Sequence, residues 1–171
     1  MQLKALGINL PSAPNRDSAL RCFPALIYSG DDRSEMGQNS KTVEAFYAAM
    51  GRGDIPFIIG ALDPQIVWHE AENFVYADKS PYIGVDALLS GLFARLVGEW
   101  DGFSAVPHEI VDGGDTVVSL GRYGGAYKAT GAKVNAQFVH VFKFKDGKIA
   151  GFQQYTDTAQ FKDAVSRRAG A

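Results

Sequence analysis

The stretch from residue 136 to residue 157 constrains the fold of this chain more than any other feature. It contains an Asp146-Gly147 pair between two segments rich in apolar and aromatic residues. Asp-Gly readily adopts the positive φ angles that a two-residue turn between antiparallel strands requires. The sequence therefore predicts a β-hairpin with its turn at these two residues.

A histidine stands in this hairpin where the alternation calls for an apolar side chain. Phe138, His140, Phe142 and Phe144 share one face of the first strand, because successive strand side chains point to opposite sides of a sheet. His140 is therefore either a core residue with satisfied hydrogen bonds or the polar group of an apolar pocket.

Length and composition indicate one soluble domain. The 171 residues suffice for one sizeable core, and the formal net charge of -2 argues against a nucleic-acid surface. Cys22 is the only cysteine, so neither a disulfide framework nor a thiolate metal cluster is expected. No apolar run approaches the ~20 residues of a membrane span. We expect a cytoplasmic protein without a metal or other cofactor.

The first 35 residues differ from the rest of the chain. Three prolines and several polar residues interrupt every periodic pattern there. This composition predicts a poorly ordered or peripheral extension, followed by a single domain over residues 36–171. An alternative hypothesis is that Met36 is the natural start and that the preceding residues are a translated leader.

Helical patterns come first after this extension. Asn39 or Ser40 can cap a helix with an apolar stripe, Gly51 and Gly53 end it, and Asp54 caps a second short helix. A third helix is expected from about residue 86. The two stripes are formed by Val43, Phe46, Tyr47 and Met50, and by Leu89, Leu92, Phe93 and Leu96.

Strand patterns dominate the second half. We expect a first strand at 65–70, further strands near 103–111, 115–128, 133–145 and 148–157, and a last helix from about residue 158. This order predicts an α+β fold with a curved, antiparallel (mixed) sheet. Three N-terminal-side helices would cover its concave face, with a short helix at the C-terminal end.

Several segments resemble the SnoaL-like, ketosteroid-isomerase-related branch of the nuclear transport factor 2-like superfamily. They are residues 50–54, 62–70, 82–86, 145–149 and 154–157, and the resemblance extends over residues 39–162. It implies the cone-shaped fold of that superfamily. Because this fold hosts unrelated chemistries and pure binding proteins, the resemblance alone does not define a reaction.

The resemblance suggests where a site would lie. His69 falls at the position of the isomerases' general base, and His140 falls at that of their second, hydrogen-bond-donating aspartate. The catalytic sets of the isomerases and of the related epoxide hydrolases are both absent. We therefore predict His69 as base and His140 as acid or donor, with Tyr123 and Gln154 positioning the substrate. Further pocket residues would be Phe46, Tyr47, Leu92, Phe93, Phe138, Phe142 and Phe152.

Neighbouring residues receive structural interpretations. Trp68 should face away from His69 in a regular strand, and Glu70 and Glu72 at the strand end are expected at the surface. The resemblance implies that the outer sheet face, with Val139, Val141 and Tyr155, pairs two subunits as a homodimer.

The expected function is cofactor-free proton transfer on a small, hydrophobic, carbonyl-bearing molecule, as an isomerase, cyclase or dehydratase. A non-catalytic ligand-binding or stress-associated module, and a structural dimer with a vestigial cavity, are the alternatives.

Overall fold

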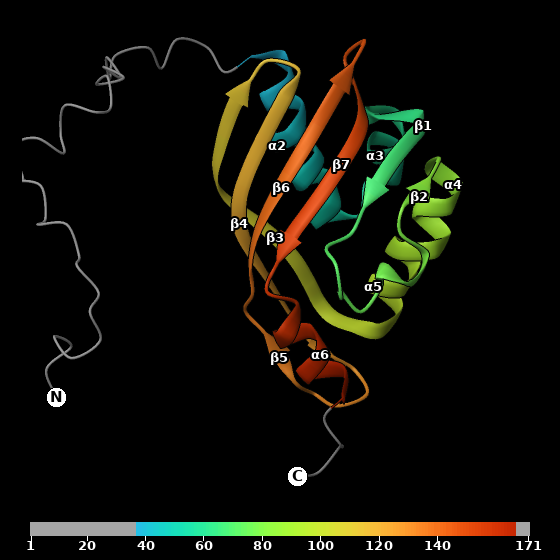
Figure 1. The fold of residues 1–171 in the computed structure, drawn as a ribbon, viewed down its shortest axis with the longest axis vertical. Helices are drawn as coiled ribbons and strands as arrows, with labels where there is room; N and C mark the ends of the chain where they lie inside the picture. The colour runs from blue at the N-terminus through green and yellow to red at the C-terminus, as the bar shows by residue number, and fades with distance from the viewer. Residues whose placement is uncertain (1–36, 167–171) are drawn as a thin grey trace, which may run out of the picture. The chain divides into compact units, whose positions relative to one another are not determined.

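The computed structural model describes residues 37–166, which form a curved sheet with helices packed against one face (Figure 1). The expectations for residues 1–35, including the alternative start at Met36, lie outside the described residues. The helical elements are α2 (Gln38–Arg52), α3 (Ile55–Ala61), η2 (Ala77–Lys79), α4 (Val85–Leu88), the π-helical turn η3 (Leu89–Phe93), α5 (Ala94–Glu99) and α6 (Thr158–Ser166).

The strands form one mixed sheet in the order β2-β1-β7-β6-β4-β3, with β5 paired to β4. β1 runs parallel to β7, and the other pairings are antiparallel. The expected α+β class with a curved, mixed sheet is confirmed. The strands are β1 (Leu62–His69), β2 (Tyr82–Ile83), β3 (Trp100–Gly113), β4 (Thr116–Tyr127), β5 (Lys133–Val134), β6 (Gln137–Lys145) and β7 (Lys148–Thr156).

The hairpin β6–β7 has the predicted turn. Asp146 and Gly147 have φ angles of 50° and 74°, and Lys145 pairs with Lys148 across them. One predicted strand, 133–145, is divided into β5 and β6. The break falls at Asn135, whose side chain accepts a hydrogen bond of 2.7 Å from Arg122.

Local signals also set most helix ends. Gly53 ends α2 with a left-handed φ of 70°, and the Asp54 side chain accepts the Phe57 amide hydrogen bond at the start of α3. The capping prediction for Asn39 or Ser40 is wrong, since Gly37 precedes the helix without a side-chain cap. The third predicted helix is interrupted by η3, which carries Phe93.

The sheet register places a polar row within an aromatic face. Ser119, His140 and Gln154 are direct neighbours on β4, β6 and β7, and all three are buried. The adjacent row is apolar and runs across four strands: Val117, Phe142, Phe152 and Trp68. The fold therefore brings three hydrogen-bonding side chains together inside its core, below α2.

Gly121 on β4 lies where the surrounding core leaves no room for a side chain. A methyl group there would overlap the ring of Phe138 and the carbonyl oxygen of Val106. We predict that Gly121→Ala lowers the free energy of unfolding by about 1–3 kcal/mol, because the core must shift to admit the added carbon. Urea unfolding measures the change.

The matched control is Gly98→Ala in α5, where an added methyl group meets nothing within 4 Å. It should leave stability unchanged or raise it by up to about 1 kcal/mol, since alanine favours helix over glycine. Equal stability of Gly121→Ala and the unmodified protein would contradict the expected crowding.

Candidate functional site

His140 lies at the centre of a buried hydrogen-bond network. The Tyr47 hydroxyl, on α2, is 2.7 Å from its Nδ1 atom, and the Tyr123 hydroxyl, on β4, is 2.5 Å from its Nε2 atom. Phe138 stacks on the imidazole with ring centres 4.0 Å apart. Both ring nitrogens are therefore engaged, and one face of the ring is covered.

The network continues on both sides of the imidazole. The Tyr47 hydroxyl also bonds Ser119, and the Gln154 amide nitrogen donates to the Tyr123 hydroxyl at 2.8 Å. The Gln154 amide oxygen accepts the Ala71 backbone N–H at 3.1 Å. One continuous chain of hydrogen bonds thus links β4, α2, β6 and β7 to the loop after β1.

Burial sets the charge states of the titratable groups in this hydrogen-bond network. It lowers the pKa of His140 to about 3 and raises the pKa values of Tyr47 and Tyr123. The imidazole is therefore neutral and both phenols keep their protons at neutral pH. A charged acid role for His140, as the sequence suggested, does not fit this environment.

A neutral imidazole allows the hydrogen bonds of this network to run in either of two directions, since one ring nitrogen donates and the other accepts. With the proton on Nδ1, His140 donates to Tyr47, and Tyr123 donates to Nε2. With the proton on Nε2, the Tyr123 oxygen accepts from both His140 and Gln154. Its own O–H is then free to donate to a group in the adjoining cavity.

Glu70 is the second buried polar group of the site and corrects a prediction. It is 7% exposed rather than at the surface. One carboxyl oxygen accepts the Trp68 indole N–H at 2.7 Å, and the other is buried without a hydrogen-bond partner among the described residues. Burial raises the pKa of this carboxyl to about 7.

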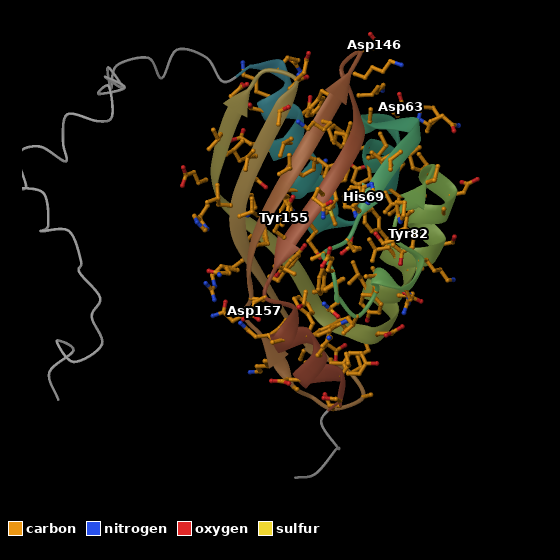
Figure 2. The ribbon with its side chains drawn as sticks, viewed as in Figure 1. Asp63, His69, Tyr82, Asp146, Tyr155 and Asp157 are labelled. Carbon is orange, nitrogen blue, oxygen red and sulfur yellow. The ribbon has the colours of Figure 1, made fainter. Side chains whose placement is uncertain are left out.

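The predicted orientation of His69 is wrong. Trp68 is buried, while His69, labelled in Figure 2, is exposed on the opposite side of β1. A shift of one residue along a strand moves every side chain to the other face. The inward set is Ile66, Trp68 and Glu70. Alternation counted from the apolar pair Ile66 and Trp68 would have identified Glu70 as the next side chain that points inward.

An inner cavity of about 30 Å³ lies between the helices and the polar row, which is room for about one water molecule. Glu70, His140, Tyr123 and Gln154 all border it. Of the predicted pocket residues, Phe138 and His69 do not line it. The apolar lining includes Phe46, Tyr47, Trp68, Leu92, Phe93, Phe103, Phe142 and Phe152.

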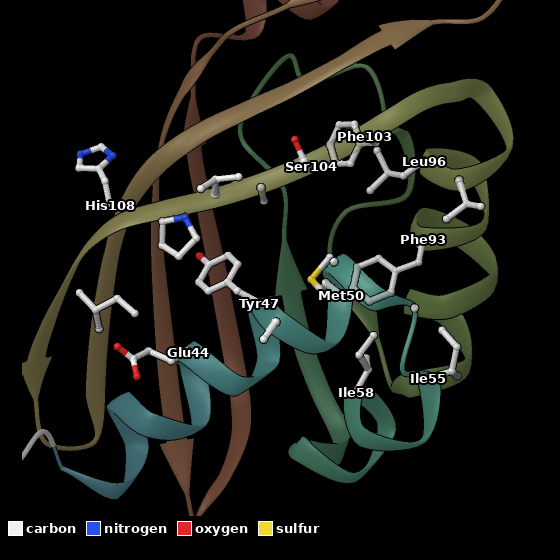
Figure 3. A pocket seen from close by; sticks show the side chains of 18 of the residues that line it. Glu44, Tyr47, Met50, Ile55, Ile58, Phe93, Leu96, Phe103, Ser104 and His108 are labelled. Atoms are coloured by element: carbon white, nitrogen blue, oxygen red, sulfur yellow. The ribbon is translucent and has the colours of Figure 1, made fainter.

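A larger outer cleft of about 590 Å³ adjoins this cavity (Figure 3). It lies between α2 and α3 on one side and β3 on the other, with α5 at one end. Tyr47, Met50, Phe93, Leu96, Phe103 and Ala105 border both spaces. The two spaces are therefore separated only by these side chains, most of them apolar.

Among residues 37–166, no cluster of three His, Cys, Asp or Glu side chains is arranged to hold a metal ion. Within the same range, no helix is both long and apolar enough to cross a membrane.

Residues 43–152 match the family model of the SnoaL-like domain. The chain belongs to the SnoaL-like family. No curated protein matches this SnoaL-like chain. Among solved structures, it is similar to an NTF2-like protein from Burkholderia thailandensis E264, with 34% identity and a TM-score of 0.72. That match covers 77% of this chain and 100% of the other.

Two further structures share the fold of this SnoaL-like protein at lower identity. A protein from Jannaschia sp. CCS1, named as a SnoaL-like polyketide cyclase, is 21% identical, with a TM-score of 0.68 over 80% of this chain and 98% of its own. TerC, co-crystallised with polyporic acid, is 23% identical, with a TM-score of 0.68; the match covers 77% of this chain and 100% of TerC.

The raised pKa of Glu70 predicts a specific pH dependence of stability. Between pH 4.5 and about 7 the unfolded chain releases the Glu70 proton while the folded protein keeps it. Folding stability therefore falls as pH rises through this window, by up to about 3 kcal/mol. Glu70→Gln should remove this loss and gain about that much over the unmodified protein between pH 4.5 and pH 8, as measured by urea unfolding.

Glu72→Gln is the matched control, because Glu72 is exposed two residues further along. It should keep the pH dependence of the unmodified protein. An identical dependence in Glu70→Gln and the unmodified protein would show that Glu70 titrates normally in the folded state.

Proposed function

We propose that this SnoaL-like protein is a cofactor-free enzyme that moves a proton within a hydrophobic, carbonyl-bearing small molecule. The reaction class is isomerisation, cyclisation or dehydration, and Glu70 is the general base. One observation carries this proposal: a buried carboxyl oxygen without a partner among the described residues borders the same cavity as a tyrosine hydroxyl.

The environment of Glu70 supports a role in proton transfer. A general base works best when its pKa lies near the operating pH, and burial brings the pKa of Glu70 to about 7. The Trp68 indole holds one carboxyl oxygen in place and leaves the other to face a substrate. His69 has no part in this proposal, because it is exposed on the other face of β1.

Tyr123 supplies the complementary donor. Glu70 removes a proton from the carbon next to the carbonyl of a β,γ-unsaturated substrate. The electron pair of that C–H bond forms a double bond to the carbonyl carbon, and the π electron pair of the carbonyl moves to its oxygen. Tyr123 donates a hydrogen bond to this oxygen when the His140 proton is on Nε2. Glu70 then returns the proton to the γ-carbon of the dienolate. The carbonyl re-forms, and the carbon–carbon double bond moves to the position between the α- and β-carbons, which completes an isomerisation without any co-reactant.

His140 acts through its neighbours in this scheme and is a positioning residue. It selects the direction of the hydrogen-bond chain and keeps the Tyr123 hydroxyl at the cavity. The size of the inner cavity favours a second candidate, a non-catalytic binding module, because about 30 Å³ cannot hold a substrate without side-chain movement. The co-crystal of TerC with polyporic acid supports small-molecule binding by this fold, without deciding between the two functions.

Exchange of α-protons tests the proposed chemistry directly. The probes are 1-tetralone and cyclohexanone, incubated with the full-length protein in D₂O, with loss of the α-proton signal followed by NMR. We expect exchange above the buffer rate with at least one ketone. Glu70→Gln should lower that rate by about 100-fold or more, and Glu72→Gln should leave it unchanged. The rate should rise with pH to a plateau above about pH 7, as Glu70 ionises.

Two outcomes would overturn the enzymatic proposal. Exchange that is equally fast in Glu70→Gln would remove Glu70 as the base. Exchange at the buffer rate with both ketones would favour the binding module.

The homodimer remains a proposal for the outer sheet face. Tyr155, labelled in Figure 2, is exposed there, on the face opposite the polar row. Val67 is also exposed. Light scattering should give twice the 18.5 kDa chain mass. Tyr155→Glu should shift it toward one chain, and Val97→Glu on α5 should not. A single-chain mass for the unmodified protein at micromolar concentration would contradict the dimer.

A further inference from the structure

The outer cleft has the dimensions of a ligand site, whereas the inner cavity does not. Its volume of about 590 Å³ falls within the ~300–1,000 Å³ range of small-molecule pockets. The residues that line it come from five elements, α2, α3, η3, α5 and β3. The cleft is thus a preformed feature of the fold, and the polar network of the candidate site lies behind it.

Exposed apolar side chains border the cleft. Val97 on α5 is 75% exposed, Val106 on β3 is 61% exposed, and Ile55 on α3 is 46% exposed. Three aliphatic side chains from three different elements thus surround one hollow. Removing their surfaces from water on ligand binding is favourable, at roughly 25 cal/mol per Å².

The charges around the cleft disfavour an anionic ligand. Glu44 on α2 and Glu109 on β3 line it, and among the described lining residues only His108 can bear a positive charge. The buried carboxyl of Glu70 lies beyond, in the inner cavity. A carboxylate, sulfonate or phosphate group would meet these carboxyl groups without a lysine or arginine beside it and would lose hydration, which is unfavourable in an apolar site.

The partition between the two spaces determines how far a ligand can reach. Met50, Phe93 and Phe103 border both the outer cleft and the inner cavity. Phe93 lies on the π-helical turn η3 and packs edge-on against Trp68, at 5.7 Å between ring centres. Trp68 in turn donates to Glu70. The side chains between a ligand in the cleft and the inner cavity therefore include Phe93, which contacts the hydrogen-bond partner of Glu70.

We propose that the outer cleft binds the ring system of an uncharged, ring-containing substrate and rejects its anionic analogues. The reacting end of the bound molecule then passes between Met50, Phe93 and Phe103 to reach Glu70. The catalytic part of this statement rests on the proposed function, whereas binding in the cleft does not.

A matched pair of fluorescent probes tests the charge selection. N-phenyl-1-naphthylamine and 8-anilinonaphthalene-1-sulfonate have the same ring system, but only the second carries a negative charge. Titration of the full-length protein should give a Kd for the neutral probe at least about tenfold below that for the sulfonate. The double variant Glu44→Lys and Glu109→Lys should reduce this ratio by strengthening sulfonate binding. Equal affinities for the two probes would overturn the selection.

A second set of variants tests the location. Ala48 lines the cleft from an exposed position of α2, so Ala48→Trp should fill part of it and weaken the neutral probe by about tenfold or more. Lys41→Trp, at another exposed position of α2 that does not line the cleft, is the control for the added indole. Unchanged affinity in Ala48→Trp would place the probe elsewhere. A Kd that rises with protein concentration would assign the cleft to a second copy of the chain.

Glu70→Gln separates this inference from the proposed function. It should retain the affinity for the neutral probe while losing ketone exchange. If the probes bind as expected in both tests but the unmodified protein shows no ketone exchange, the cleft is a ligand site and the proposed enzymatic function is wrong. If exchange depends on Glu70 but Ala48→Trp does not change probe binding, the enzymatic function stands and the proposed ligand site is wrong.

Discussion

The pair of hydrogen bonds from Tyr47 and Tyr123 to His140 is the interaction on which the rest of the site depends. A strand face made of phenylalanines accommodates an imidazole only because two tyrosine hydroxyls satisfy both ring nitrogens. Ser119 and Gln154 occupy the neighbouring positions of the sheet and extend the chain. Since a partly satisfied buried network is worse than an apolar core, loss of either tyrosine hydroxyl would destabilise the whole row.

Glu70 contrasts with this satisfied network. One of its oxygens accepts a hydrogen bond from Trp68, and the other is buried without a partner among the described residues. Keeping a carboxyl group there opposes folding at high pH, because ionisation in an apolar enclosure is unfavourable. A protein selected for stability alone would place an apolar side chain at this position. The network and Glu70 thus provide a neutral hydrogen-bond donor and a titratable acceptor that line one small cavity.

Local patterns in the sequence predict much of this architecture. The Asp146-Gly147 turn, the end of α2 at Gly53 and the cap at Asp54 depend on neighbouring residues, so alternation and turn chemistry were sufficient. The orientation of β1 was predicted wrongly. The resemblance assigned the inward position to His69, whereas the alternation of Ile66 and Trp68 points to Glu70. The tyrosine contacts of His140 arise from α2 and β4, far apart in sequence, and required the folded structure.

The ionisation of Glu70 tests the central claim most directly. Carbon-13 labelling of glutamate side chains, with the Glu70 carboxyl signal assigned by comparison with Glu70→Gln, allows its titration to be followed by NMR in the folded protein. A midpoint near pH 7 is predicted, because the group is buried with one oxygen unpaired. A midpoint near 4.5, the ordinary value for a solvated glutamate, would contradict the account.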